Sequence, residues 1–109
     1  MKKALYGLVV LLLFSVVQFN VSDTFADKIG YKKIFTNNCQ KCHGKDGKGT
    51  KRGKGLGVPN FTDSEWQDAT TDKQMITAIT NGKKKMPKQG HKLSPEEIKA
   101  VVKYIRFFA

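Results

Sequence analysis

Acidic residues and cysteines are both scarce in this chain of 109 residues, and each scarcity reduces the number of functions that fit the sequence. Nine Asp and Glu stand against 20 Lys and Arg, so the formal net charge is +11. Only two cysteines are present, so disulfides can contribute little to the stability of the core. The length permits one small domain and excludes both a two-domain protein and a multilayered α/β enzyme.

Long apolar runs are missing except near the N-terminus, where the 19 residues 4–22 carry no charge. Lysines precede this run and Thr24-Phe25-Ala26 follows it, which is the layout of a secretory signal peptide. We therefore expect residues 1–26 to be a signal peptide and residues 27–109 to be the functional domain. An uncleaved membrane anchor is the alternative, because the run is just long enough to cross a bilayer. Both interpretations place the domain outside the cytoplasm, and we expect a periplasmic protein.

A domain of this size usually recruits a disulfide, a metal or a bound cofactor to complete its core. The two cysteines belong to the motif Cys39-Gln40-Lys41-Cys42-His43, which matches the C-x-x-C-H pattern of c-type haem attachment. On a helical turn, two thiols at this spacing can each reach one vinyl group of the same porphyrin. His43 then lies under the iron as its proximal ligand. The sequence thus predicts one covalently bound haem c.

Three other uses of these residues compete with haem attachment. A thioredoxin-like dithiol needs a βαβ pattern, and no strand-like alternation precedes Cys39. A zinc site that adds His91 to the motif is disfavoured, because the neighbouring Cys42 and His43 cannot easily face one tetrahedral ion. A disulfide across two residues closes a very small loop and stabilises little.

The spacing of apolar residues predicts helices joined by loops, with no convincing strand. A first helix is expected from about Asp27 to Asn38, ending at the cysteine pair. Residues 44–57 contain six of the ten glycines, which predicts a mobile, solvated loop and not a helix. The expected fold class is all-α, a bundle of about four to five short helices wrapped around one covalently attached haem.

Capping boxes predict where two later helices begin. Thr71 and Gln74 form the first box, at the start of a helix over 72–81. Ser94 and Glu97 form the second box, at the start of the C-terminal helix. The apolar face expected on this last helix consists of Ile98, Val101, Val102 and Ile105.

Further motifs recur in an order that is typical of one protein family and cover about residues 28–107. They are Gly44 after the haem motif, Pro59-Asn60-Phe61, Asn81-Gly82, Met86-Pro87 and Val102-Lys103-Tyr104-Ile105. With them, the chain resembles a small bacterial class I cytochrome c with a single haem. One departure is Tyr31, which stands where the family usually has a small residue at the crossing with the last helix.

The resemblance implies that Met86 is the second axial ligand, opposite His43. Met75 is the other methionine of the expected domain, but it lies at apolar spacing on a predicted helix, where methionine is more often part of the core. Met86 stands in a lysine-rich loop, where a lone apolar residue gains little unless it turns inward. His91 is the alternative ligand, and we expect it to be an exposed loop residue.

The resemblance also assigns residues around the two ligands. The carbonyl oxygen of Pro59 is expected to accept the proton on the other ring nitrogen of His43. Trp66 is expected either to donate its indole N–H to a haem propionate or to pack at the rim with its nitrogen in solvent. The residues expected to wall the haem are Phe35, Phe61 and Val101.

The function that the resemblance implies is the transfer of single electrons between redox proteins outside the cytoplasm, without an enzymatic reaction. Lysines flank the expected ligand loop at Lys83, Lys84, Lys85, Lys88 and Lys92. Such a patch steers encounter with an acidic docking surface. The expected partners are therefore acidic redox proteins, including a membrane-bound oxidase or reductase, and not nucleic acid.

Two alternative functions remain open at this point. One is a haem subunit of a membrane oxidoreductase complex, with the leader retained as an anchor. The other is a ligand-binding or peroxidase-like haem protein in which Met86 is labile.

Overall fold

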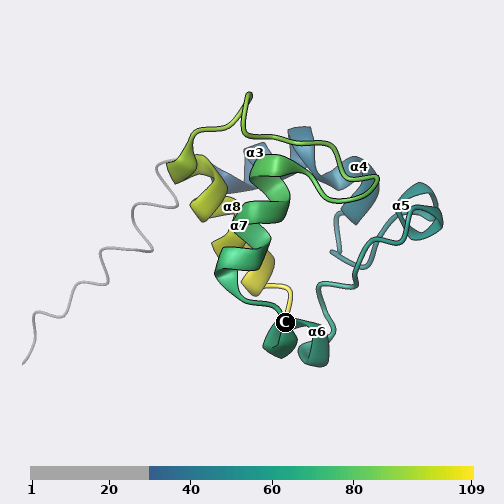
Figure 1. The fold of residues 1–109 in the computed structure, drawn as a ribbon. Coiled ribbons are helices and arrows are strands. Elements are labelled where there is room, and N and C mark those ends of the chain that lie inside the picture. Colours follow the sequence, from purple (N-terminus) through teal and green to yellow (C-terminus); the bar gives the residue numbers. More distant parts are fainter. Residues whose placement is uncertain (1–29) are drawn as a thin grey trace, which may run out of the picture.

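The structure is a computed structural model that describes residues 30–109, so the expected signal peptide and residues 27–29 of the expected first helix lie outside the described residues. The described part is helical, with one isolated bridge between Lys83 and Met86 (Figure 1). Its six helices are α3 (Tyr31–Asn38), α4 (Gln40–His43), α5 (Lys51–Gly55), α6 (Ser64–Ala69), α7 (Asp72–Asn81) and α8 (Pro95–Arg106). The all-α fold class is confirmed. Over this same range, no helix combines the length and the apolar content that crossing a membrane requires.

The two predicted capping boxes are present in the structure. Thr71 Oγ1 accepts a hydrogen bond from Gln74 N–H at 3.1 Å, and Gln74 Oε1 accepts one from Thr71 N–H at 2.8 Å. Ser94 and Glu97 form the same reciprocal pair before α8, at 3.2 and 2.9 Å. Each pair satisfies two N–H groups that a helix start leaves without partners, and both helices begin where the sequence predicts.

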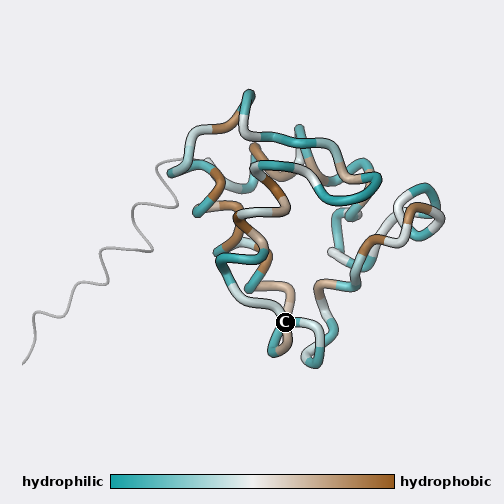
Figure 2. Tube along the Cα trace, in the orientation of Figure 1, coloured by the Kyte–Doolittle hydropathy of each residue, from teal (hydrophilic) through white to brown (hydrophobic). Residues whose placement is uncertain are grey.

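The core lies where α3 and α7 pack against α8, and apolar residues recur along these helices (Figure 2). The whole predicted apolar face of α8 is buried. Phe35 and Val101 are the most deeply buried large side chains among the described residues, at 1% and 0% exposure. The buried cluster consists of Phe35, Cys39, Phe61, Met75, Ile79, Leu93, Ile98, Val101, Val102 and Ile105.

Aromatic rings fill the crossing of α3 and α8. The ring of Tyr31 lies 5.2 Å from that of Tyr104, measured between centroids, and 6.5 Å from that of Phe107. Tyr104 also meets Phe35 edge-on at 5.0 Å. The large residue that departs from the family pattern is therefore accommodated by tilted contacts with other aromatic rings, which are favourable at these distances.

The prediction that residues 44–57 form only a loop was wrong, because α5 lies within them. The hydroxyl oxygen of Thr50 caps this helix by accepting a hydrogen bond from Gly53 N–H at 3.0 Å. Glycine costs about 1 kcal/mol relative to alanine inside a helix. The packing of α5 against α4 offsets this cost, and it requires a glycine at position 53, because a Cβ there would clash with the carbonyl group of Cys42.

This contact predicts that two glycines of the same short helix respond oppositely to substitution. Gly53→Ala should lower the free energy of unfolding by about 1 to 3 kcal/mol, because the added methyl group overpacks the contact with Cys42. Gly55→Ala is the matched control. It places its methyl group in open space and should be neutral or stabilise by about 0.5 to 1 kcal/mol. Urea unfolding of the purified proteins measures both effects, and equal effects would contradict the packing of α5 on α4.

Candidate haem-binding site

The cysteine motif forms a single helical turn that continues from α3. Cys39 lies at the junction, where its N–H donates to the carbonyl oxygen of Phe35 at 2.8 Å. His43 N–H donates to the carbonyl oxygen of Cys39 at 2.9 Å and closes the turn. Neither cysteine is in a disulfide; Cys39 is buried and Cys42 is half-buried. The turn therefore offers two thiols at the spacing that the attachment of one porphyrin requires.

Burial raises the pKa of the Cys39 thiol to about 11, so it is protonated at neutral pH. A thiol in this form is a poor nucleophile, which argues against a reactive dithiol. His91 is exposed. Within residues 30–109, no three His, Cys, Asp or Glu side chains gather as a metal site would require.

His43 is buried, and its imidazole ring stacks on Phe61 with centroids 4.7 Å apart and planes 15° apart. Burial lowers the pKa of His43, which favours the neutral imidazole that ligates metals. Its Nδ1 atom is buried without a hydrogen-bond partner, so the bond to Pro59 that the resemblance implies is not present in the structure. A buried nitrogen left unpaired costs about 1 to 3 kcal/mol. The turn therefore holds a neutral, incompletely satisfied imidazole beside two free thiols, and this donor set fits a covalently attached haem.

The glycine-rich segment 44–57 satisfies the carbonyl groups at the end of the cysteine turn. Gly49 N–H donates to the carbonyl oxygen of His43 at 2.8 Å, and Thr50 N–H donates to that of Cys42 at 2.9 Å. The hydroxyl of Thr50 donates to the carbonyl oxygen of Lys41 at 2.8 Å. Three successive carbonyl groups that a helix end leaves unpaired are thus bonded by one short segment. The segment thereby fixes the motif in place.

Met86 lies in the segment between α7 and α8, which crosses the top of the view in Figure 1. A tight turn presents it, because the backbone N–H groups of Lys83 and Met86 each donate to the carbonyl oxygen of the other, at 3.1 and 2.9 Å. Lys84 adopts a left-handed conformation, with φ of 55°, inside this turn. Met86 is half-buried and packs against the core, as expected of a residue that turns inward, whereas Met75 is buried in α7.

Phe61 and Trp66 gather on the same side as His43. Their rings lie 5.2 Å apart with planes tilted by 36°, so Phe61 contacts the imidazole on one side and the indole on the other. Phe61 is buried and Trp66 is half-buried on α6. Cys39, Phe61, Met86 and Trp66 all belong to or pack against one apolar cluster.

Two buried glutamines were missed by the sequence analysis. Gln67 lies on α6 and donates two hydrogen bonds to backbone carbonyl groups. Gln89, three residues after Met86, is buried with its Oε1 atom unpaired. The backbone N–H of Gln89 donates to the carbonyl oxygen of Ile79 at 2.8 Å. This bond ties the segment that carries Met86 to the last turn of α7. No local pattern marks either glutamine, because their burial depends on contacts with other elements.

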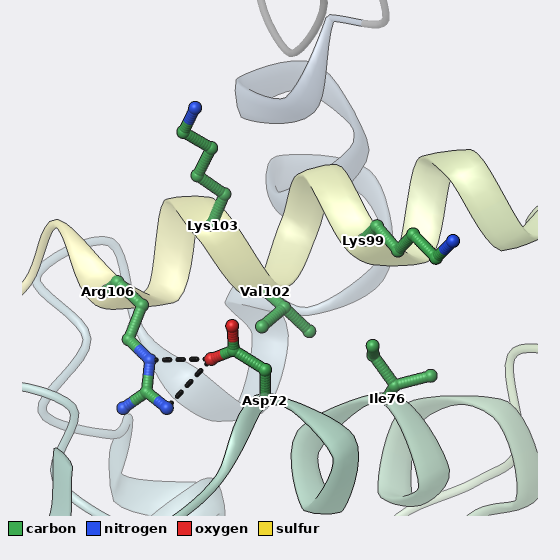
Figure 3. A pocket seen from close by; sticks show the side chains of 6 residues that line it. All are labelled: Asp72, Ile76, Lys99, Val102, Lys103 and Arg106. Atoms are coloured by element: carbon green, nitrogen blue, oxygen red, sulfur yellow. Dashed lines mark hydrogen bonds and ion pairs between the residues drawn. The ribbon is translucent and has the colours of Figure 1, made fainter. Parts of the chain in front are cut away.

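A surface pocket of about 450 Å³ lies elsewhere, between α7 and α8 (Figure 3). None of the expected site residues lines it. Its walls are Asp72, Ile76, Lys99, Val102, Lys103 and Arg106.

The proteins that match this chain by sequence and by structure all point to the same family. The family described as cytochrome C oxidase, cbb3-type, subunit III matches residues 30–105. A solved structure, the KustC0563 c-type cytochrome, superposes with a TM-score of 0.68 at 43% identity, covering 70% of this chain and 93% of that one. Cytochrome c6 of Anabaena variabilis is 37% identical over 84 residues, which are 73% of this chain and 90% of that protein.

Several relatives are much longer than this chain. The cbb3-type cytochrome c oxidase subunit FixP of Azorhizobium caulinodans is 42% identical over 84 residues, which cover 76% of this chain but 27% of that protein. Subunit CcoP of Rubrivivax gelatinosus is 36% identical over 76 residues, which cover 23% of that protein. The chain thus spans about a quarter of the length of these oxidase subunits.

Proposed function

Since this chain belongs to the c-type cytochrome family described as cbb3-type cytochrome c oxidase subunit III, we propose that it is an exported one-electron carrier whose haem iron is ligated by His43 and Met86. A c-type cytochrome domain holds its haem c covalently. The observation that carries the proposal is the cysteine turn, with two free thiols beside a buried imidazole. When bound, the haem supplies one iron that alternates between the ferrous and ferric states.

The attachment uses the two thiols. Each thiol of Cys39 and Cys42 would add across a vinyl group, with sulfur on one carbon and hydrogen on the other, so that no oxidant is needed. The imidazole of His43 is then kept near the iron by its neighbours in the chain. Its neutral form, favoured by burial, is the form that can donate a lone pair.

Met86 would donate its thioether sulfur from the opposite side. The tight turn of residues 83–86 and the bond from Gln89 to Ile79 both restrain this segment. Methionine in place of a second histidine raises the reduction potential of a haem, because the soft thioether is a weaker donor than an imidazole and favours the ferrous state. A haem iron with both axial positions filled has none open for a substrate, so we propose electron transfer without an enzymatic reaction in this domain.

The proposed partners are acidic surfaces of redox proteins, among them a membrane-bound oxidase. The five lysines around Met86 are all exposed, at Lys83, Lys84, Lys85, Lys88 and Lys92. No acidic residue occurs between Lys73 and Pro95. A surface that carries charges of a single sign accelerates encounter with an oppositely charged partner and makes the association sensitive to salt.

A second candidate function is a haem subunit within a membrane oxidase complex. The observation that favours it is the 42% identity to the FixP subunit. The two candidates differ in whether the first 26 residues are removed and whether the domain is released.

Replacing Met86 tests the ligand assignment. Met86→Ala should abolish the sulfur-to-iron charge-transfer absorption near the red end of the ferric spectrum, lower the reduction potential and allow carbon monoxide to bind the ferrous protein readily. Met75→Leu is the matched control, since a volume-conserving change in the core costs less than about 1.5 kcal/mol and should leave the spectrum unchanged. Loss of the band in Met75→Leu but not in Met86→Ala would reverse the assignment.

Charge reversal tests the docking surface. The double variant Lys84→Glu, Lys85→Glu should slow oxidation by hexacyanoferrate(III), an anionic probe, by about tenfold at low ionic strength. The variant Lys32→Glu, Lys33→Glu changes the net charge equally, but on α3. At 0.1 M, where salt screens charges beyond about 10 Å, a local docking site predicts a much smaller effect for the control. If the oxidation rates of the two double variants depend equally on ionic strength, only the overall charge matters.

Processing of the N-terminus separates the two candidate functions. For a free carrier, N-terminal sequencing of the exported protein should begin at Asp27. The protein should then partition with the soluble periplasmic fraction. A haem-containing protein that retains Met1 and stays in the membrane fraction would instead support the subunit.

A further inference from the structure

Gln67 uses every hydrogen-bonding group of its side chain. Its Nε2 atom donates to the carbonyl oxygen of Phe61 at 2.8 Å and to that of Ile105 at 2.9 Å. Its Oε1 atom accepts from Arg106 Nη1 at 2.9 Å. Gln67 is 6% exposed, so these bonds form largely away from water, where an unpaired group is costly. The side chain therefore joins α6, the end of α8 and the backbone of Phe61.

Arg106 fixes which way this amide faces. The guanidinium also donates from Nη1 to the carbonyl oxygen of Gln67 and from Nη2 to that of Thr70, both at 2.6 Å. Its Nε atom donates to Asp72 Oδ1 at 2.9 Å, and Nη2 forms an ion pair with the same oxygen at 2.8 Å (Figure 3). A planar guanidinium held by four acceptors cannot rotate without losing several bonds. Because Arg106 offers only donors, it holds Oε1 toward itself and leaves Nε2 for Phe61.

Phe61 is consequently held on both sides of its backbone. Its N–H donates to the carbonyl oxygen of Gly47 at 2.9 Å, and its carbonyl oxygen accepts from Gln67. Its ring lies nearly parallel to the imidazole of His43, with planes 15° apart. With ring centroids 4.7 Å apart, this contact restrains the plane of the imidazole.

We propose that Gln67 and Arg106 are positioning residues that set the plane of the His43 imidazole through Phe61. The inference rests on the proposed function, because it takes His43 as the axial nitrogen ligand. The plane of an axial imidazole decides which iron d orbital it overlaps. A change in that plane therefore alters the anisotropy of the ferric electron paramagnetic resonance (EPR) spectrum, whereas loss of stability alone does not.

The chemistry at position 67 requires an amide. A glutamate carboxylate has no donor and would place an oxygen against the carbonyl groups of Phe61 and Ile105. A methionine has almost the same shape as glutamine but can form none of the three bonds. Gln67→Met is accordingly the sharpest variant, because it removes the hydrogen bonds and retains most of the packing volume.

The test compares ferric EPR spectra of the full haem-containing chain. Gln67→Met should change the g-anisotropy. Arg106→Lys should change it in the same direction but less, since lysine keeps the charge but lacks the several N–H donors of the planar guanidinium. Ser94→Ala is the control for stability, because it removes the N-cap of α8 and leaves position 67 untouched. It should lower the unfolding midpoint without changing the EPR spectrum.

The proposal is overturned if Gln67→Met lowers the unfolding midpoint while its g-values match those of the natural protein. If Gln67→Met does not yield folded protein, Arg106→Lys decides, since it should shift the g-values and unchanged values refute the proposal. His43→Ala separates this proposal from the proposed function. An unchanged low-spin spectrum in His43→Ala means that His43 is not the ligand, whereas loss of that spectrum with an unshifted Gln67→Met defeats the positioning role alone.

Discussion

The carbonyl oxygen of Cys42 is the point on which the geometry of the site depends. It accepts a hydrogen bond from Thr50 N–H at 2.9 Å, and the glycine at position 53 allows α5 to approach it closely. The segment that forms these contacts also bonds the carbonyl of His43 and, through Gly47, the N–H of Phe61. One irregular, glycine-rich segment therefore fixes both the turn that carries the thiols and the ring that stacks on the imidazole. Glycine is required there for close approach, although it weakens the helix.

The charges are separated along the fold. Residues 55–72 contain four acidic residues and no Lys or Arg, whereas the segment around Met86 contains only basic ones. Figure 1 shows α6 and the segment between α7 and α8 at opposite ends of the molecule. An acidic partner is thus attracted by one end and repelled by the other, so the field favours approach with Met86 facing the partner. A uniformly basic domain would attract the same partner without this orientation.

The sequence predicted the elements whose signals are local and missed those that depend on distant contacts. The starts of α7 and α8 follow from residues three positions apart, and both are confirmed. The helix α5 was missed because its glycines disfavour a helix unless the contact with Cys42 is known. The role of Gln67 was hidden for the same reason, since one of its acceptors, Ile105, is 38 residues away. The cysteine motif predicts how the haem is attached, but the arrangement of side chains around His43 depends on packing between elements that are distant in the sequence.

The interior of the domain is compatible with either a free carrier or an oxidase subunit, because this part of the chain matches both 27% of an oxidase subunit and 90% of a cytochrome c6. The difference must therefore lie at the surface. A carrier has to leave its partner after each electron, which requires an interface that forms quickly and holds weakly. Exposed lysines around Met86 suit such an interface, because their long-range attraction speeds encounter, whereas exposed ion pairs add little free energy to the bound complex. A permanent subunit gains nothing from rapid dissociation, so the lysine-rich rim favours the carrier.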